Sequence, residues 1–405
     1  MPKFSLKKTS ILATQSAVKL SKFIPFFVII AQNLLGLTLK FDKKILSYFD
    51  YIQPLLILPI IIFSYLLISE ANTALGNKQL VYFGVGFVVF MVFFLFPIRK
   101  FLYLIPLFYW VNIALLLSVE FFGISKLGAK RWLELPFVHF TLQPSEIMKP
   151  ACMLMLMYLI HKNPPPPEGY GVKDFAKFSF YILLPFALIA KEPDLGTALI
   201  LFLMGFATLF IIGVNKKIWI ALVLAFSVSS PVLYNNLHDY QKKRITDFLS
   251  EEHNYQVKQA VIAIGNGGIY GKNLEEATQT HFKFLPIATS DFIFAYMVER
   301  FGFVGALALI GFYALLIMHL LSLNYDFGSD YLIRVFTSAL ATLIFIYAGV
   351  NISMVIGFAP VVGVPLPFFS YGGSSFITFM ILFGILQNLL TFRNKDNYKT
   401  ISIRL

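Results

Sequence analysis

The stretch "YIQPLLILPIIIFSYLLISE", residues 51–70, decides the fold class of this chain. It is a continuous apolar run whose single charge, Glu70, stands at its very end. A helix of about 20 mainly apolar residues is long enough to cross the hydrocarbon core of a bilayer. The stretch therefore predicts a membrane-spanning helix.

Windows of the same kind recur along the chain. They lie at roughly 79–98, 101–122, 143–161, 174–190, 195–213, 218–234, 291–321, 332–352 and 374–391. The composition agrees, since 58% of the 405 residues are hydrophobic and only 13% are charged, against about a quarter in soluble domains. We therefore expect an all-α polytopic membrane protein with about ten transmembrane helices. The window at 291–321 is long enough to need a tilt or an extension beyond the bilayer.

The basic residues of the short loops predict the orientation. Lys and Arg favour the cytoplasmic side of short loops, and the basic short loops share one side only if the chain starts inside. These residues are Arg99, Lys100, Lys162, Lys173, Lys177, Lys216 and Lys217. Both termini are then cytoplasmic, and the outer loops are 123–142, 235–290 and 353–373, the long second one between helices 7 and 8.

Three parts of unequal size follow from this topology. Residues 51–392 form a single ten-helix membrane domain, and residues 393–405 form a basic cytoplasmic tail. Residues 1–50 are basic and apolar and include "FIPFFVIIAQNLLGLTL" at 23–39, which looks like a signal anchor. If that segment spanned, every later helix would be inverted, so we interpret it as cytoplasmic or interfacial, or as the product of an upstream start assignment.

The overall composition excludes several classes of function. The single cysteine, Cys152, excludes an intrachain disulfide framework or a multi-thiolate metal site, and the six histidines show no HExxH spacing. The net charge of +12 is spread over the loops, so nothing indicates a nucleic-acid-binding domain. Anionic lipids or an anionic substrate are the natural partners of such charge.

Two constellations of polar residues stand at predicted outer helix ends. In "GAKRWLELPFVHFTLQPSEIMKPA", 128–151, the Arg131–Trp132 pair suits the lipid headgroup level, while Glu146 and Lys149 share a helix face. A buried ion pair that fixes helix packing explains Glu146 and Lys149 equally well. In "KEPDLGTALI", 191–200, Glu192 and Asp194 occupy a very short outer turn. Helix capping by Asp194 is the ordinary alternative there.

Three further segments carry polar or irregular sequence. The run "GNGGIYGK", 265–272, resembles a phosphate-cradling loop that ends in Lys272, but it matches neither a P-loop nor a dinucleotide fingerprint. The prolines and glycines of "PVVGVPLPFFSYGGSS", 360–375, cannot continue a helix, and Ser370, Ser374 and Ser375 offer hydroxyl groups at that depth. In "SDFIFA", 290–295, Asp291 stands at the mouth of a predicted helix, where capping has about even odds.

Taken in order, these motifs resemble the SEDS family of shape, elongation, division and sporulation proteins over roughly residues 40–392. Within the family, "PVVGVPLPFFSYGG" is similar to the rod-shape branch, because the division branch usually lacks "VPLP". The resemblance implies a ten-helix peptidoglycan glycosyltransferase of the bacterial cytoplasmic (inner) membrane that uses lipid II. It also implies a class B penicillin-binding protein and elongation-machinery proteins as partners.

The resemblance also implies roles for single residues. The family's catalytic aspartate falls on Asp291. Substrate-binding positions fall on, or lie beside, Arg131, Trp132, Glu146, Lys149, Asp194, Lys272, Ser370, Ser374 and Ser375. This chain departs from the family at Lys283, Ile287 and Thr289, where an acid, an acid and a histidine are often present. The departures weaken any case for a second acid or a histidine in proton relay or metal binding.

These roles define a hypothesis for the reaction. Asp291 would deprotonate the acceptor hydroxyl, and an inverting attack would release undecaprenyl diphosphate, neutralised by Arg131, Lys149 and either Lys272 or a divalent cation (Mg or Mn). Glu192, Asp194 and Asp291 offer oxygen ligands for such a cation, with Asp194 and Asp291 as the candidate metal ligands, but they are too few to assert a dedicated site. A lipid II flippase and a non-catalytic scaffold for a penicillin-binding protein are the alternatives.

Overall fold

The computed structural model describes most of the expected membrane domain. The described residues are 37–39, 48–126, 129–135, 140–192, 194–235, 242, 246, 255–277, 279, 284–285, 288–393 and 401–403. Most of the basic and apolar segment at 1–50, most of the tail at 393–405, Lys283 and Ile287 lie outside them. Strands β1 (Leu37–Leu39) and β5 (Ile401–Ile403) pair antiparallel within a separate unit formed by residues 1–49 and 390–405.

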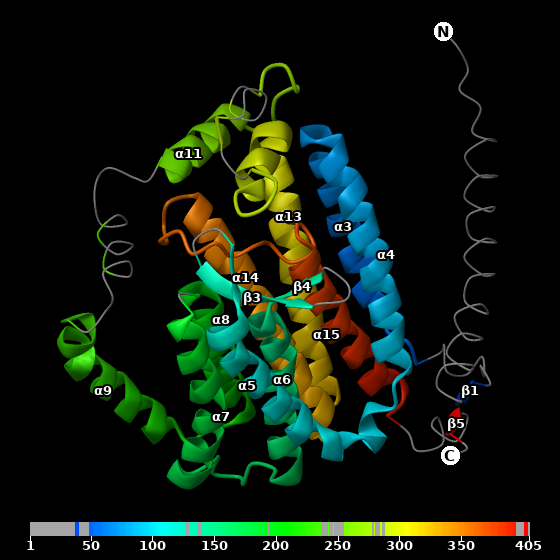
Figure 1. Cartoon of the computed structure of the whole chain (residues 1–405), viewed down its shortest axis with the longest axis vertical. Helices are drawn as coiled ribbons and strands as arrows, with labels where there is room; N and C mark the ends of the chain where they lie inside the picture. The colour runs from blue at the N-terminus through cyan, green and yellow to red at the C-terminus, as the bar shows by residue number, and fades with distance from the viewer. Residues whose placement is uncertain are drawn as a thin grey trace. The chain divides into compact units, whose positions relative to one another are not determined.

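Ten long helices occupy the ten predicted windows in the part of the chain that the structure describes (Figure 1). They are α3 (Ile52–Ala71), α4 (Thr73–Leu95), α5 (Ile105–Phe122), α6 (Pro144–Lys162), α7 (Val172–Lys191), α8 (Leu195–Ile212), α9 (Lys216–Asn235), α13 (Ile293–Asp326), α14 (Tyr331–Val355) and α15 (Gly373–Thr391). Short 3₁₀ turns at Ile98–Lys100 and Leu102–Leu104 precede α5. The fold prediction of an all-α polytopic membrane protein is confirmed.

Length and apolar composition alone qualify seven of these described helices as spans: α3, α4, α5 with its preceding turn, α8, α13, α14 and α15. The other three carry more charge near an end. Helix α6 includes Glu146 and Lys149, α7 includes Lys173 and Lys177, and α9 begins at Lys216. Charges at helix ends can reach the membrane interface, so the charges on these three helices are compatible with the predicted spans.

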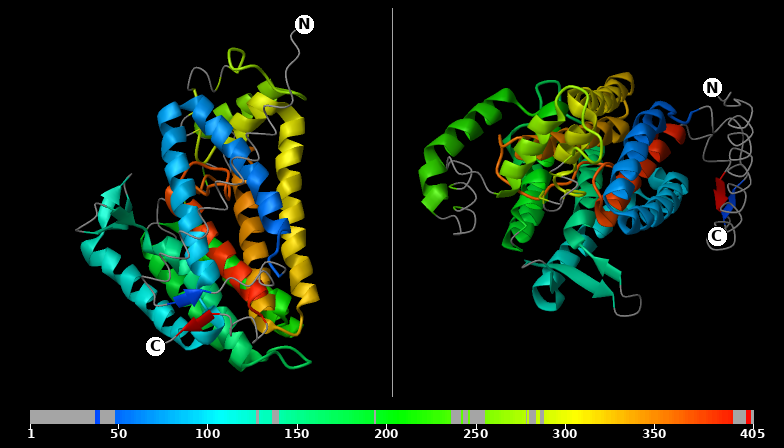
Figure 2. Two further views of the ribbon diagram at one scale, coloured as in Figure 1. Left: turned by 90° about the vertical axis from the view of Figure 1, so that its right-hand side faces the viewer. Right: turned by 90° about the horizontal axis from the view of Figure 1, so that it is seen from above.

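Because successive helices alternate in direction, the connections gather at two ends of the bundle (Figure 2). One end, called here the sheet end, holds the α5–α6 and α7–α8 connections and the starts of α13 and α15. The other, called the basic end, holds Arg99, Lys100, Lys162, Lys173 and Lys216. The grouping of the basic short loops at one end matches the pattern from which the orientation was predicted.

The connection between α5 and α6 contains a small sheet that the sequence did not predict. Strands β2 (Ile124–Lys126), β3 (Ala129–Leu135) and β4 (Phe140–Leu142) pair antiparallel in the order β2-β3-β4. The run "KRWLEL" mixes polar and apolar residues without strict alternation, so it carries only a weak strand signal. It was overlooked because the surrounding sequence reads as a loop between helices.

Helix α13 is long because two helices meet in it at Gly302. This residue has a φ of 65° and a ψ of −165°, a backbone conformation open to glycine. The segment after α11 (Tyr255–Gly267) packs there, and the Phe303 and Val304 amides donate to the carbonyls of Gly268 and Ile269 at 2.9 and 3.1 Å. A Cβ on Gly302 would lie 2.4 Å from the Gly271 nitrogen. The predicted tilt or extension is therefore a kink.

The same packing explains the glycine-rich run. The Gly271 amide donates to the Gly267 carbonyl at 2.8 Å, and the Lys272 amide donates to the Glu299 carbonyl at 2.9 Å. A Cβ on Gly267 would lie 2.1 Å from the Val298 carbonyl oxygen. These glycines allow close backbone contact with α13, and the two amides serve protein acceptors. The interpretation of the run as a phosphate cradle gains no support.

Residues 356–372 cross the sheet end without a helix or strand, as the prolines and glycines predict. The segment is mostly buried at Val364, Leu366 and Phe369. Side chains from neighbouring helices satisfy its carbonyls: Tyr313 donates to Pro367 and Ser64 donates to Phe369, both at 2.6 Å. Irregular backbone at membrane depth needs such partners, so the helices hold this segment in one conformation.

Candidate active site

Asp291 lies in a turn immediately before α13, at the sheet end. The Asn351 side-chain amide, near the end of α14, donates to the Asp291 carbonyl at 2.8 Å and to the Val364 carbonyl at 2.6 Å. Gly363, with a φ of 69°, lies so close that a Cβ there would be 3.6 Å from Asp291 Oδ2. Asn351 therefore joins the aspartate backbone to the irregular segment, and Gly363 leaves room beside the carboxylate.

Ser370 joins the same two segments. Its hydroxyl donates to the Ser290 carbonyl at 2.6 Å and accepts from the Leu366 amide at 2.8 Å. The Tyr371 amide donates to the Thr289 carbonyl at 2.9 Å. The backbone on both sides of Asp291 is thus fixed, which is the arrangement a positioned reactive group needs.

The structure does not use Asp291 as a helix cap. The N-cap residue of α13 is Phe292, and no side-chain hydrogen bond caps this helix start. Burial raises the pKa of the Asp291 carboxyl, and a hydrogen bond with the Ser290 side chain opposes that rise. A carboxylate whose pKa lies above its ordinary value is a stronger base near neutral pH.

Asp194 both caps a helix and pairs with Arg131. Its Oδ1 accepts from the Thr197 amide at 3.4 Å, at the start of α8, and lies 3.4 Å from Arg131 Nη1. Its Oδ2 accepts from the Gln143 side-chain amide at 3.1 Å. Asp194 therefore caps α8, as the ordinary alternative proposed, and the same carboxylate also forms an ion pair with Arg131. Trp132 follows Arg131 in β3, opposite Ile124.

The irregular segment connects this acid–base pair to Asp291. A Cβ on Gly196, in the first turn of α8, would lie 2.6 Å from the Val362 carbonyl oxygen, so α8 abuts the segment directly. The next residue, Gly363, faces the Asp291 carboxylate. Asp194 and Asp291 therefore lie around the same few residues, although the sequence separates them widely.

Glu146 and Lys149 form a buried pair. Lys149 Nζ lies 2.6 Å from Glu146 Oε1, and it also donates to the Tyr347 hydroxyl on α14. Only 1% of the Lys149 side chain is exposed. Glu146 Oε2 is buried without a hydrogen-bond partner among the described residues. These contacts are those expected of the structural alternative, and a substrate role for the pair stays a prediction.

Glu192 is the acid that the sequence places beside Asp194 and offers as a possible oxygen ligand for a cation. Both its carboxylate oxygens are buried and lack hydrogen-bond partners in the described part of the chain. Burial raises its pKa to about 8, with Asp194 adding to the rise and Arg131 opposing it. It lines a cavity of about 140 Å³ with Leu116 and Leu188. This carboxyl therefore holds its proton to a higher pH than an ordinary glutamate does.

The remaining predicted residues lie at other places on the sheet end. The Lys272 side chain is exposed beside the α13 kink, and Ser374 and Ser375 are half-buried in the first turn of α15. No group of three or more His, Cys, Asp and Glu side chains able to hold a metal ion occurs in the described residues. The role of Asn351 in holding Asp291 was not predicted from the sequence. Its one signal there is a polar amide side chain within an otherwise apolar helix.

A family model described as "Cell cycle protein", covering FtsW, RodA and SpoVE, matches residues 42–395. The chain belongs to this family. It is the SEDS family that the motifs resemble, and the match covers nearly the whole described membrane domain.

Curated members of the family include two relatives named "Peptidoglycan glycosyltransferase MrdB". The Helicobacter pylori (strain ATCC 700392 / 26695) protein is 54% identical over 89% of this chain and 94% of its own length. The Escherichia coli K12 protein is 36% identical over 85% and 94%. A Geobacter metallireducens relative named "Probable peptidoglycan glycosyltransferase FtsW" is 32% identical over 68% and 74%. The resemblance to the rod-shape branch is confirmed.

Solved structures share the fold. The structure titled "Structural coordination of polymerization and crosslinking by a peptidoglycan synthase complex" aligns with a TM-score of 0.74 and 24% identity over 87% of this chain and 99% of that chain. The Thermus thermophilus rod shape determining protein RodA aligns with a TM-score of 0.64 and 24% identity over 85% and 97%. The polytopic helical architecture is thus that of known family members.

Proposed function

We propose that this protein is a peptidoglycan glycosyltransferase that polymerises lipid II at the outer face of the bacterial cytoplasmic membrane during cell elongation. The observation that carries the proposal is the held position of Asp291, whose backbone is fixed on both sides while its half-buried carboxylate faces Gly363. The relatives named for this activity support it. In the orientation predicted from the basic short loops, the sheet end faces the cell exterior and both termini are cytoplasmic.

In the proposed reaction Asp291 is the general base. It takes the proton from the 4-hydroxyl of the acceptor sugar, and that oxygen attacks the anomeric carbon of the donor. The bond from this carbon to the diphosphate oxygen breaks, the configuration inverts, and undecaprenyl diphosphate leaves with the electron pair. The proton later passes from Asp291 to water. General-base assistance of this kind is typically worth ~10²–10⁴ in rate.

Arg131 is the proposed electrostatic partner of the leaving group. It is tied to Asp194, which abuts the segment that faces Asp291. A guanidinium matches diphosphate oxygens with several donors at once, and charge stabilisation is worth most where water is scarce. Trp132, Ser374, Ser375 and Lys272 are proposed to contact the sugar and diphosphate around this centre, whereas Ser370 acts by holding the segment.

The partner is proposed to be a class B penicillin-binding protein that crosslinks the glycan strands. The fold shared with a chain from a peptidoglycan synthase complex supports a paired arrangement. Elongation-machinery proteins complete the proposed assembly.

The test uses purified full-length protein with its class B partner and fluorescent lipid II. Asp291→Asn and Asp291→Ala should abolish polymer on gels. Asp326→Asn, the same acid-to-amide change at the exposed far end of α13, should polymerise normally. If both Asp291 variants polymerise lipid II normally, Asp291 is not the general base. Lipid II translocation in liposomes without polymer would instead favour a flippase.

A further inference from the structure

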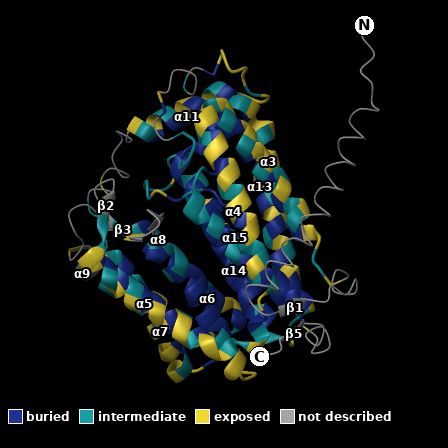
Figure 3. Cartoon of the chain, turned by 45° about the vertical axis from the view of Figure 1, so that its right-hand side comes forward, coloured by how far each residue is buried: buried dark blue, intermediate teal, exposed yellow. Residues whose placement is uncertain are grey.

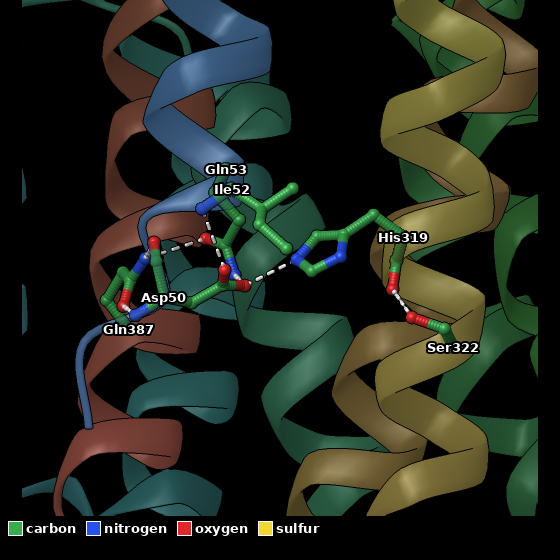
Figure 4. A network of polar contacts seen from close by, with 6 residues as sticks. All are labelled: Asp50, Ile52, Gln53, His319, Ser322 and Gln387. Atoms are coloured by element: carbon green, nitrogen blue, oxygen red, sulfur yellow. Dashed lines mark hydrogen bonds and ion pairs between the residues drawn. The ribbon is translucent and has the colours of Figure 1, made fainter. Parts of the chain in front are cut away.

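Helices α3 and α13 are tied to each other near both ends. At the sheet end, Arg300 donates to both carboxylate oxygens of Glu70, at 2.5 and 2.9 Å, and Tyr296 donates to the same acid at 2.9 Å. At the basic end, His319 Nε2 lies 2.6 Å from Asp50 Oδ2 (Figure 4). The separation of the two helices is therefore fixed at both ends.

The tie at the basic end is itself anchored. Gln53 donates to Asp50 Oδ2 at 2.7 Å, and Gln387 of α15 exchanges hydrogen bonds with the Asp50 backbone at 2.7 and 3.1 Å (Figure 4). Asp50 thus connects α13 and α15 to the start of α3.

Between the two ties lies an apolar cavity of about 240 Å³. Its walls come from α3, α13 and the irregular segment and carry only apolar residues, among them Ile60, Phe63, Met297, Val304 and Phe369. Small residues on α13, such as Ala308, leave the space open. Phe63 is 45% exposed and Val304 is 50% exposed, so the cavity opens sideways onto the outer surface of the bundle. Both α3 and α13 carry many exposed residues along their length (Figure 3).

The inner end of the cavity meets the candidate active site. Phe369 lines the cavity, and the next residue, Ser370, is bonded to the carbonyl that precedes Asp291. Met297 lines it as well, about one turn inside the helix that follows Asp291. The cavity therefore leads from the membrane-facing surface to the backbone that holds the proposed base.

We propose that this cavity binds the polyprenyl chain of the lipid-linked substrate, in the segment next to the diphosphate. The proposal rests on the proposed function, because such a substrate must place a sugar diphosphate near Asp291 while its chain enters the bilayer. A cavity of about 240 Å³ is too small in volume to hold a transmembrane helix, which is about 10–12 Å wide along its whole length. A linear hydrocarbon chain fits it and buries apolar area against aromatic and aliphatic walls.

The first test measures binding without catalysis. The wild-type protein is irradiated with a polyprenyl diphosphate that carries a diazirine on its first isoprene units, and the labelled peptides are mapped. Labelling should fall on residues 60–63 and 297–312 and should be competed by unlabelled polyprenyl diphosphate. Labelling elsewhere would overturn the proposal. Equal competition by phosphatidylglycerol would also overturn it, by showing a general lipid site.

The second test fills the cavity. Ala308→Phe should reduce this labelling about tenfold and raise the KM for long-chain lipid II more than for a short-chain analogue, with a tenfold change corresponding to ~1.4 kcal/mol. Ala314→Phe is the matched control, because Ala314 is exposed on the same helix outside the cavity wall. Equal effects of the two variants would overturn the proposal. If the wild-type protein is labelled at these residues but forms no polymer from lipid II, the proposed function is wrong and the proposed binding site is retained.

Discussion

The buried Lys149 and the half-buried Asp291 are both ionisable groups at the sheet end, and they are held in opposite ways. The Lys149 ammonium is occupied by Glu146 and by the Tyr347 hydroxyl. Asp291 is held through its backbone, and Ser290 is the hydrogen-bond partner of its carboxylate. A charged side chain that is paired with neighbouring side chains stabilises the fold. A charged side chain whose position is fixed through its backbone can instead interact with a substrate.

The largest expected effect is a loss of activity without a loss of stability at Asp291. Asp291→Asn should lower the polymerisation rate by ~10²–10⁴. Its thermal unfolding temperature in detergent should not fall, because the amide removes a carboxylate whose pKa burial has raised. A clear drop in the unfolding temperature would show that Asp291, like Lys149, stabilises the fold.

The converse is expected at Lys149. Lys149→Met leaves Glu146 buried without its cation and should cost about 3–5 kcal/mol of stability, measured by denaturation in detergent. The double variant Glu146→Gln/Lys149→Met should recover much of this loss, since no unpaired charge then remains. If Lys149→Met is as stable as the wild type but fails to bind lipid II, Lys149 has a substrate-binding role. The contrast drawn between a structural Lys149 and a reactive Asp291 is then wrong.

A smaller effect is expected from crowding the Asp291 carboxylate. Gly363→Ala places a side chain at a φ of 69° and close to Asp291 Oδ2. The backbone penalty is roughly 1–2 kcal/mol, enough to shift the segment away from its native position. Polymerisation should fall about tenfold, since each 1.36 kcal/mol corresponds to a tenfold change. Gly372→Ala is the control, because a Cβ there has open space and its φ is not left-handed.

The smallest expected effects are in the pH profile of kcat/KM. The base must be ionised, so activity should rise with pH through the Asp291 pKa, with a midpoint above the ordinary value of about 3.9. Glu192, whose pKa is raised to about 8, is neutral below that pH and negative above it. Its ionisation adds negative charge beside Asp194, so activity should fall above about pH 8.

Glu192→Gln separates these two limbs. It should remove the alkaline fall and leave the acid limb in place, because the amide stays neutral at every pH. An unchanged alkaline limb would show that another group causes it.

The sequence predicted the helices and marked Asp291 as a candidate residue because both depend on local signals. Apolar windows mark the helices, and Asp291 stands where one of them begins. Long-range contacts carried no such signal. Asn351 reaches Asp291 across 60 positions and Glu70 reaches Arg300 across 230, so neither pairing follows from spacing. The kink at Gly302 and the β2–β4 sheet were missed for the same reason, since each is set by a distant or opposing segment.

The lone cysteine has a practical consequence for settling which way the protein lies in the membrane. Cys152 is fully buried in α6, with its thiol directed at the Tyr181 carbonyl at 3.8 Å. A membrane-impermeant maleimide applied to intact cells should therefore not react with Cys152. Single cysteines introduced at Lys272 and Glu168, both exposed and at opposite ends of the bundle, can then be tagged in the natural background. Their labelling would report directly which end faces the cell exterior.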